Sequence, residues 1–390
     1  MEVDWSHLPP ELLETISSKL PIYSDYLRFR AVCRSFLSSV PRTPRHMPPQ
    51  LPWLLLSADT SSFFNPQDRR VYILRRPTKP PSLLSGRRCC GSSHGWLATL
   101  GDAPDVLLFN PLTLSQVDLP PLSAFPNVLS FDYANVGREY ILRSPFGKLV
   151  SLDLSHMRDS FVQKIVLSSA PTDDPEFAAV AVLTSHDLAV CRHGDSRWTF
   201  VEGASSYTED VIYRDGSFHA LHKSGRVAVF SPSSAPEVSF VEAHGRFQGD
   251  LHYLVSAGED WLLVTRYLKI QCEDEPHLAM HKTAGFDVFK LDRRIESGPR
   301  WVKMTDLGDY MLFVGRNSSL ALRASEFPGC EGDCIYFTDD YSEYNSDWIG
   351  EPDVGIYRLW DGGIEPLPCY PQSTAHLIRP QPIWLTRNPR

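Results

Sequence analysis

The sequence predicts a mainly β protein in which a small α-helical unit at the N-terminus precedes a β-propeller of roughly seven blades, with a range of about six to eight. Three observations support this class. Helical periodicity of the apolar residues is confined to residues 4–40. Prolines crowd residues 41–52. From residue 53 onward, short apolar strand–turn–strand units recur about every 40–55 residues.

The N-terminal stretch contains two predicted amphipathic helices. The first begins after Pro9 and Pro10, which a first helical turn tolerates because its N–H groups have no partner there. Its apolar face is formed by Leu12, Leu13, Ile16 and Leu20. Ser24 is the predicted N-cap of the second helix, whose apolar face is formed by Phe29, Val32, Cys33 and Phe36. A segment of about forty residues cannot build an adequate core alone, so these faces either join a larger core or dock on another protein.

The motifs in this stretch resemble an F-box. They are the opening Leu8-Pro9-Pro10-Glu11-Leu12-Leu13, the following Ile16 and Leu20-Pro21, and the string Arg28-Phe29-Arg30-Ala31-Val32-Cys33-Arg34. The family often has Trp where this chain has Phe36. F-box motifs bind the Skp-family adaptor of cullin–RING ubiquitin ligases. The resemblance therefore implies an adaptor-docking set of Leu8, Pro9, Leu12, Leu13, Ile16, Leu20, Val32, Cys33 and Phe36, some of which must instead hold the helices together. The alternative is an ordinary helical hairpin of a larger domain.

Composition supports a two-part protein with no segment that crosses a membrane. The proline-rich stretch favours an extended, stiff spacer, and the predicted divisions are residues 1–44 for the F-box, 45–52 for the linker and 53–390 for the propeller. The formal net charge of −9 argues against general nucleic-acid binding. The N-terminus is too polar for a signal peptide, and no run reaches the roughly 18 apolar residues of a membrane span. The eight scattered cysteines indicate reduced thiols and a cytoplasmic and/or nuclear location.

The region after residue 52 is predicted to consist of repeated β-hairpins. Examples are residues 95–111, 140–154, 178–192, 210–230, 252–268, 311–324 and 334–367, each divided by turn residues such as Asp215-Gly216. Trp198 and Trp301 recur in matching contexts that indicate outer strands. Ring closure is expected to bring Ile383 and Trp384 into one sheet with residues 53–74, because an unpaired sheet edge is a liability. A pair of β-sandwiches or an irregular barrel is the alternative fold.

The β region also resembles a known propeller domain. The matching segments are CGSSHGWL (90–97), LLFNPLTLSQVDLPPL (107–122), FVQKIVLSSAP (161–171), residues 210–230, residues 300–322 and IYFTDD (335–340). They are similar to the plant KIB-type β-propeller domain, which commonly follows an N-terminal F-box. The resemblance implies a propeller fold and a role in recruiting a substrate. It implies no catalytic or cofactor site.

Two short patterns imitate sites of chemistry. Gly91-Ser92-Ser93-His94-Gly95 fits the G-x-S-x-G nucleophile elbow, but that chemistry needs a helix after the serine, and the strand-like run WLATL follows. We expect instead a tight turn into a strand, with Trp96 packed between sheets. Cys272, His277 and His281, with Cys330 and Cys334 further on, lack the close pairs typical of zinc sites. We therefore expect no catalytic residue, no cofactor and no metal.

Residues 336–353 form a stretch of strong acidic and aromatic character. One interpretation is a solvated insertion between strands. The other is a candidate substrate-recognition loop, because exposed aromatic residues anchor interfaces and acidic neighbours attract a basic partner. The residues expected to carry that recognition are Asp339, Asp340, Tyr341, Tyr344 and Trp348.

These observations together predict a substrate-recognition subunit of a Skp–cullin–F-box (SCF) ubiquitin ligase. Its partners are expected to be a Skp-family adaptor, a cullin through that adaptor, and an unidentified protein substrate, without nucleic acid or membrane. Such a subunit does no bond chemistry; it raises the effective concentration of a substrate near the ubiquitin-charged enzyme. The alternatives are a binding or inhibitory propeller protein outside a ligase, and a propeller hydrolase using Ser93.

Overall fold

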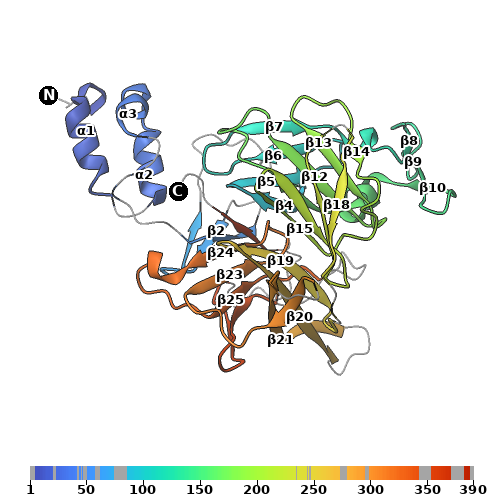
Figure 1. The fold of residues 1–390 in the computed structure, drawn as a ribbon. Coiled ribbons are helices and arrows are strands. Elements are labelled where there is room, and N and C mark those ends of the chain that lie inside the picture. The colour runs from blue at the N-terminus through green and yellow to red at the C-terminus, as the bar shows by residue number, and fades with distance from the viewer. Residues whose placement is uncertain are drawn as a thin grey trace.

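Short helices near the N-terminus and a larger body of β-sheets make up the protein (Figure 1). The computed structural model describes residues 5–20, 23–41, 44, 46, 51–57, 62–73, 86–233, 235–243, 245, 247–272, 279–294, 298–341, 353–369 and 382–386. None of the helices in these ranges has the length and hydropathy needed to cross a bilayer.

The helical unit contains three α-helices after a short 3-10 turn. Its elements are η1 (Trp5–His7), α1 (Pro10–Ser17), α2 (Tyr23–Arg30) and α3 (Arg34–Ser39). The prediction of a single second helix is therefore wrong: Cys33 has extended backbone angles, φ −158° and ψ 176°, and so separates α2 from α3. This break turns the side chain of Val32 away from the face predicted by a continuous helical period.

Seven sheets follow in the part of the chain that the structure describes. Six of them form the ring of a β-propeller, and the three-stranded side sheet lies outside that ring. The closing blade contains β28 (Ile383–Leu385), β1 (Trp53–Ser57), β2 (Ser62–Asn65) and β3 (Arg70–Ile73). The next blade contains β4 (Arg88–Ser93), β5 (Trp96–Leu100), β6 (Val106–Phe109) and β7 (Gln116–Leu119). The side sheet contains β10 (Leu149–Leu152), β9 (Tyr140–Arg143) and β8 (Val128–Phe131).

Three regular four-stranded blades come next, and each follows the order of the chain. They are β11 (Val162–Leu167), β12 (Ala178–Leu183), β13 (Leu188–Arg192) and β14 (Thr199–Phe200); β15 (Asp210–Arg214), β16 (Ser217–Leu221), β17 (Val227–Phe230) and β18 (Val238–Val241); and β19 (Leu251–Ala257), β20 (Asp260–Cys272), β21 (Ala279–Asp292) and β22 (Arg300–Lys303). The five-stranded blade has the order β24 (Leu320–Arg323), β23 (Tyr310–Val314), β25 (Cys334–Phe337), β26 (Gly355–Arg358) and β27 (Ile364–Pro366).

Short helical segments fill some of the connections between these strands. They are η2 (Leu122–Ala124), α4 (Leu154–His156), η3 (Met157–Phe161) and η4 (Ala324–Glu326). The strand pairs of the sheets are antiparallel except β23 with β25, which run parallel. The predicted Asp215-Gly216 turn is confirmed, because both residues have the positive φ values, 51° and 80°, that a tight hairpin turn requires between β15 and β16.

The ring closes as predicted, through pairing of its two ends. In the closing blade, Leu54 lies opposite Trp384 and Leu55 opposite Ile383 in an antiparallel pair. The last strand of the chain thereby takes the place of a first strand, and the edge of β1 is paired rather than open. The indole of Trp384 packs edge-on against Phe313 of the five-stranded blade, with 5.3 Å between ring centroids.

The side sheet lies outside the ring of inner strands. Although it falls between two blades in sequence, β4 of the preceding blade packs directly on β11 of the following one. The approach is so close that a Cβ on Gly91 would lie 2.1 Å from the carbonyl oxygen of Ile165, so only glycine fits there. In Figure 1 the side sheet projects from the body at the end farthest from the helices.

Buried polar groups join the inner strands near the propeller axis. Lys164 on β11 forms an ion pair of 2.6 Å with Asp210 on β15. The other carboxylate oxygen of Asp210 accepts hydrogen bonds from the hydroxyl of Ser319, at 2.7 Å, and from the backbone N–H of Leu254, at 3.0 Å. One buried carboxylate thus connects four blades, and the removal of either charge would leave the other buried and unpaired.

The two tryptophans from matching contexts lie beside outer strands, as predicted. Trp198 precedes β14, and Trp301 lies in β22. Each indole N–H donates a hydrogen bond of 2.8 Å to a carbonyl oxygen of an earlier blade region, that of Pro120 and that of Gly225 respectively. Each large apolar side chain is thereby buried with its one polar atom satisfied.

Candidate functional site

The helical unit has a small core of its own. Its buried residues are Leu13, Tyr26, Phe36 and Val40, which come from all three α-helices and the residue after α3. The hydroxyl of Tyr26 donates a hydrogen bond of 2.6 Å to the carbonyl oxygen of Pro41, which holds the exit of the chain against α2. In the part of the chain that the structure describes, this core is separate from the clusters between the blades.

Apolar side chains also point outward from this unit. Besides Trp5 of η1, which is 63% exposed, they are Leu12, Ile16, Val32 and Leu37, with exposed fractions of 50, 38, 64 and 48%. Other residues form the small core, and these four side chains are not part of it. We call them the exposed helical surface. Apolar area left in water is unfavourable, and a group of such residues on short helices is typical of a docking surface.

The structure divides the nine predicted adaptor-docking residues into three groups. Leu13 and Phe36 are buried in the helical core. Leu8, Leu20 and Cys33 are half-buried against that core. Pro9, Leu12, Ile16 and Val32 are exposed. Sequence reasoning missed Leu37. It assumed one continuous helix across residues 29–36, whereas a separate helix, α3, begins after Cys33 and turns Leu37 outward.

The acidic residues after β25 bind a buried arginine. Arg266 of β20 is 1% exposed, and its guanidinium lies 2.9 Å from Asp340 and 3.0 Å from Asp353. Asp353 also accepts hydrogen bonds of 2.6 Å from the backbone N–H and the hydroxyl of Thr283. The two ends of the acidic segment are therefore fixed to the blade that contains β20 and β21.

Asp339 and Asp340 are turned into the protein, so the expectation that they are presented to a basic partner is wrong. Asp339 is 6% exposed, and burial raises the pKa of its carboxyl to about 6. The ring of Tyr341 packs against His281 at 4.6 Å. Tyr344 and Trp348 lie outside the described residues. Arg266 is the physical reason for the inward turn, since a buried guanidinium needs carboxylate partners.

The G-x-S-x-G pattern forms a β-hairpin rather than a nucleophile elbow. Ser93 ends β4 and lies opposite Trp96, the first residue of β5. Ser93 is only 2% exposed, and its hydroxyl accepts a hydrogen bond of 3.2 Å from the backbone N–H of Leu167. Trp96 is buried between sheets, as predicted. No helix follows the serine, so the geometry that presents a nucleophile in hydrolases is missing at this position.

The cysteines and histidines whose spacing argued against a zinc site fall into two groups. His277 lies outside the described residues, so the structure does not test the group that contains it. Among the residues that are described, no three His, Cys, Asp or Glu side chains gather to hold a metal ion. Cys330 and Cys334 both line a pocket, and burial raises the pKa of both thiols, which opposes formation of the metal-binding thiolate.

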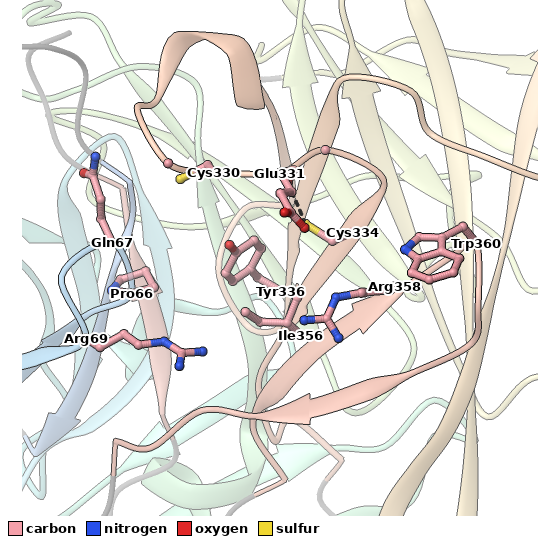
Figure 2. A pocket seen from close by; sticks show the side chains of 12 residues that line it. Pro66, Gln67, Arg69, Cys330, Glu331, Cys334, Tyr336, Ile356, Arg358 and Trp360 are labelled. Carbon is pink, nitrogen blue, oxygen red and sulfur yellow. Dashed lines mark hydrogen bonds between the residues drawn. The ribbon is translucent and has the colours of Figure 1, made fainter.

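That pocket lies on the seam where the closing blade meets the five-stranded blade (Figure 2). Its volume is about 280 Å³. Arg69 pairs with Glu365 across the seam, whereas Arg358 pairs with Glu365 within the five-stranded blade. The hydrogen bond from Arg69 is the main cause that lowers the pKa of this carboxyl. Trp360 is largely exposed. Sequence reasoning missed this pocket because Arg69 and Glu365 are 296 positions apart in the chain.

The fold and the helical surface together define a class: a two-part protein with a helical docking unit and a propeller, both suited to contacts with other proteins. Comparison with known families gives the particular group. Residues 5–46 match the F-box domain, and residues 63–358 match the KIB1-4 beta-propeller. The chain therefore belongs to the F-box proteins that carry a KIB1-4 β-propeller.

Curated relatives from Arabidopsis thaliana support this assignment. F-box protein SKIP23 is 30% identical over 100% of this chain and 97% of its own length. F-box protein At2g17036 is 26% identical over 98% of this chain and 95% of its own length. F-box proteins are generally non-catalytic adaptors, and an F-box domain implies binding of a Skp1-type adaptor.

Proposed function

We propose that this chain is a substrate-recognition subunit of an SCF ubiquitin ligase. Its helices bind a Skp-family adaptor and, through it, a cullin; its propeller binds a protein substrate. The observation that carries this proposal is the exposed helical surface, in which Leu12, Ile16, Val32 and Leu37 face solvent beside a core that is complete without them.

The mechanism is proximity without bond chemistry. The helices and the side sheet lie at opposite ends of the molecule in Figure 1, so a substrate held on the propeller leaves the helices free for the adaptor. A substrate held in this way is at high effective concentration relative to the ubiquitin-charged enzyme. We place this activity in the cytoplasm and/or the nucleus, where the cysteines stay reduced.

The test uses full-length protein and a purified Skp-family adaptor. Val32→Asp and Leu12→Asp place a charge in the proposed interface, where burial of an unpaired carboxylate is costly, so each is expected to weaken adaptor binding at least about tenfold. Val302→Asp is the matched control, because Val302 is similarly exposed, at 46%, but lies on β22 of the propeller.

Two results would contradict the proposal. One is adaptor binding by both helical variants at the level of the control. The other is adaptor binding by the wild-type chain without co-purification of a cullin from a mixture that contains both; this would favour the binding or inhibitory role outside a ligase. Thermal unfolding of each variant, measured in parallel, verifies that the propeller remains folded.

A further inference from the structure

Among the described residues of the propeller, exposed apolar side chains are concentrated in the side sheet. Six of them lie within this sheet and its two turns. They are Leu129, Tyr133, Val136, Phe146, Leu149 and Val150, with exposed fractions of 48, 56, 88, 90, 67 and 40%. Isolated exposed apolar residues are ordinary on protein surfaces, but a group of this size marks an interaction site.

The sheet is held in place by its inner face. Tyr140 and Leu142 of β9 are buried in the cluster between the neighbouring blades, and Val128, Phe131 and Leu152 pack on that cluster. The exposed residues therefore do not result from a loosely attached sheet. They occupy the outer positions and the two turns of a sheet that is anchored at its inner side.

Strand β10 has an open edge and two exposed faces. It is the terminal strand in the spatial order β10-β9-β8, so its second side pairs with no strand among the described residues. Leu149, Val150 and Ser151 are exposed in succession, although successive side chains of a strand point to opposite faces. Unpaired backbone N–H and C=O groups along such an edge are a template for an added strand.

Three basic residues lie near this edge. Arg143 lies directly opposite Leu149 across the β9–β10 pair, and Lys148 precedes Leu149 in the turn. Arg138 lies in the other turn, and all three cations are exposed. Among the described residues, none of these three forms an ion pair within the chain. The acidic residues of this region are placed differently: Glu139 is buried, Asp132 lies in the turn with Arg138, and Asp153 follows β10 and accepts hydrogen bonds from His156. Arg143 and Lys148 are therefore the charges beside Leu149.

We propose that the open edge of β10, together with Phe146, binds an extended acidic segment of a partner protein. The segment adds to the side sheet as a further strand, its apolar side chains contact Leu149 and Val150, and its carboxylates face Arg143 and Lys148. Phe146, in the turn between β9 and β10, is the aromatic anchor. The inference deepens the proposed function, because it names the surface and the chemistry by which the propeller takes its substrate.

The probe is a fluorescein-labelled eight-residue peptide with the repeat Asp-Asp-Val-Val, measured by fluorescence anisotropy against the full-length protein. This repeat presents both aspartate and valine on each face of an added strand. Phe146→Ser combined with Leu149→Ser is expected to weaken binding at least about tenfold. Phe240→Ser combined with Val302→Ser is the matched control, since these residues are 41 and 46% exposed on other blades. The control is expected to bind like wild type.

Two altered probes separate the parts of the proposal. A peptide with lysine in place of aspartate is expected to lose binding, because the edge is basic, and added salt is expected to weaken the acidic peptide. A peptide with N-methyl groups on alternate amides cannot donate the backbone hydrogen bonds of a strand and is expected to lose binding as well.

Several results would overturn the inference. They are absence of binding by the acidic peptide, equal binding of the acidic and lysine peptides, equal binding of the N-methylated peptide, or equal losses in the two double variants. Sedimentation experiments give a further test. If the wild-type protein is a dimer and Leu149→Ser dissociates it, a second copy of the chain occupies the edge, and the inference is overturned. Adaptor binding is measured on the same proteins: if it is retained while peptide binding fails, this inference falls and the proposed function stands.

Discussion

Removal of the last strand tests how the propeller is held together. A chain that ends at Ser373 lacks β28, whose residues Ile383, Trp384 and Leu385 are each no more than 1% exposed. Burial of such a side chain contributes about 1.5–3 kcal/mol, so the loss of three amounts to about 5–9 kcal/mol. A typical domain is stable by only about 5–15 kcal/mol, and the truncated chain is therefore expected to lose most of its stability.

The assay is urea and thermal unfolding followed by circular dichroism. The matched control is a chain that ends at Thr386, which keeps β28 and is expected to unfold like the full-length protein. A milder variant, Trp384→Ala, is expected to cost about 3–5 kcal/mol, because Phe313 and Tyr336 pack against the indole. If the chain ending at Ser373 unfolds at the same midpoint as the control, β28 does not close the ring in the way its pairing indicates.

Four further predictions concern the separate parts. A fragment of residues 51–390 should be soluble and unfold cooperatively, because the N-terminal helices pack in a separate core; aggregation would contradict this. Leu13→Asp should unfold the helical unit without changing propeller unfolding, since Leu13 is buried there. Arg266→Met should destabilise the propeller by about 3–5 kcal/mol, because two carboxylates lose their partner; an unchanged urea midpoint would refute that role. Asp339→Asn should stabilise the protein by about 3 kcal/mol at pH 7 and lose this advantage at pH 4.

The direction of this pH dependence follows from the raised pKa of Asp339. Burial raises the pKa of the folded carboxyl from 3.8 to about 6, so the folded protein binds more protons than the unfolded chain between these values. The contribution of Asp339 to stability is therefore complete below pH 4 and is lost as the pH rises to 6. His219, whose pKa burial lowers to about 4, acts in the opposite direction over the same range. The difference between the Asn variant and wild type, measured at several pH values, isolates Asp339.

Much of the fold could be predicted because its signals are local in the sequence. The turn at Asp215-Gly216 and the strands on either side depend on residues close together in the chain, and the structure places them as predicted. The pairing of Trp384 with the strand after the linker is a long-range feature, yet it too was predictable, because two short apolar segments at the ends of a ring have few other edges to pair with.

The candidate sites were less predictable because they depend on contacts between distant residues. Leu12 and Leu13 are adjacent and belong to one predicted apolar face, but α2 and α3 cover only Leu13. Asp340 is 74 positions from Arg266, and nothing near it in sequence shows that it points inward.

The sequence by itself therefore determined that a helical unit, a strand repeat and a closing strand are present, since periodicity, turn residues and motifs can be recognised in short segments of the chain. Only the tertiary structure decided which apolar residues remain in water. The direct packing of β4 on β11 leaves the side sheet outside the ring, and that placement exposes Phe146 and Leu149. Which faces are covered depends on how blades meet, and this is a property of the assembled sheets rather than of any single segment.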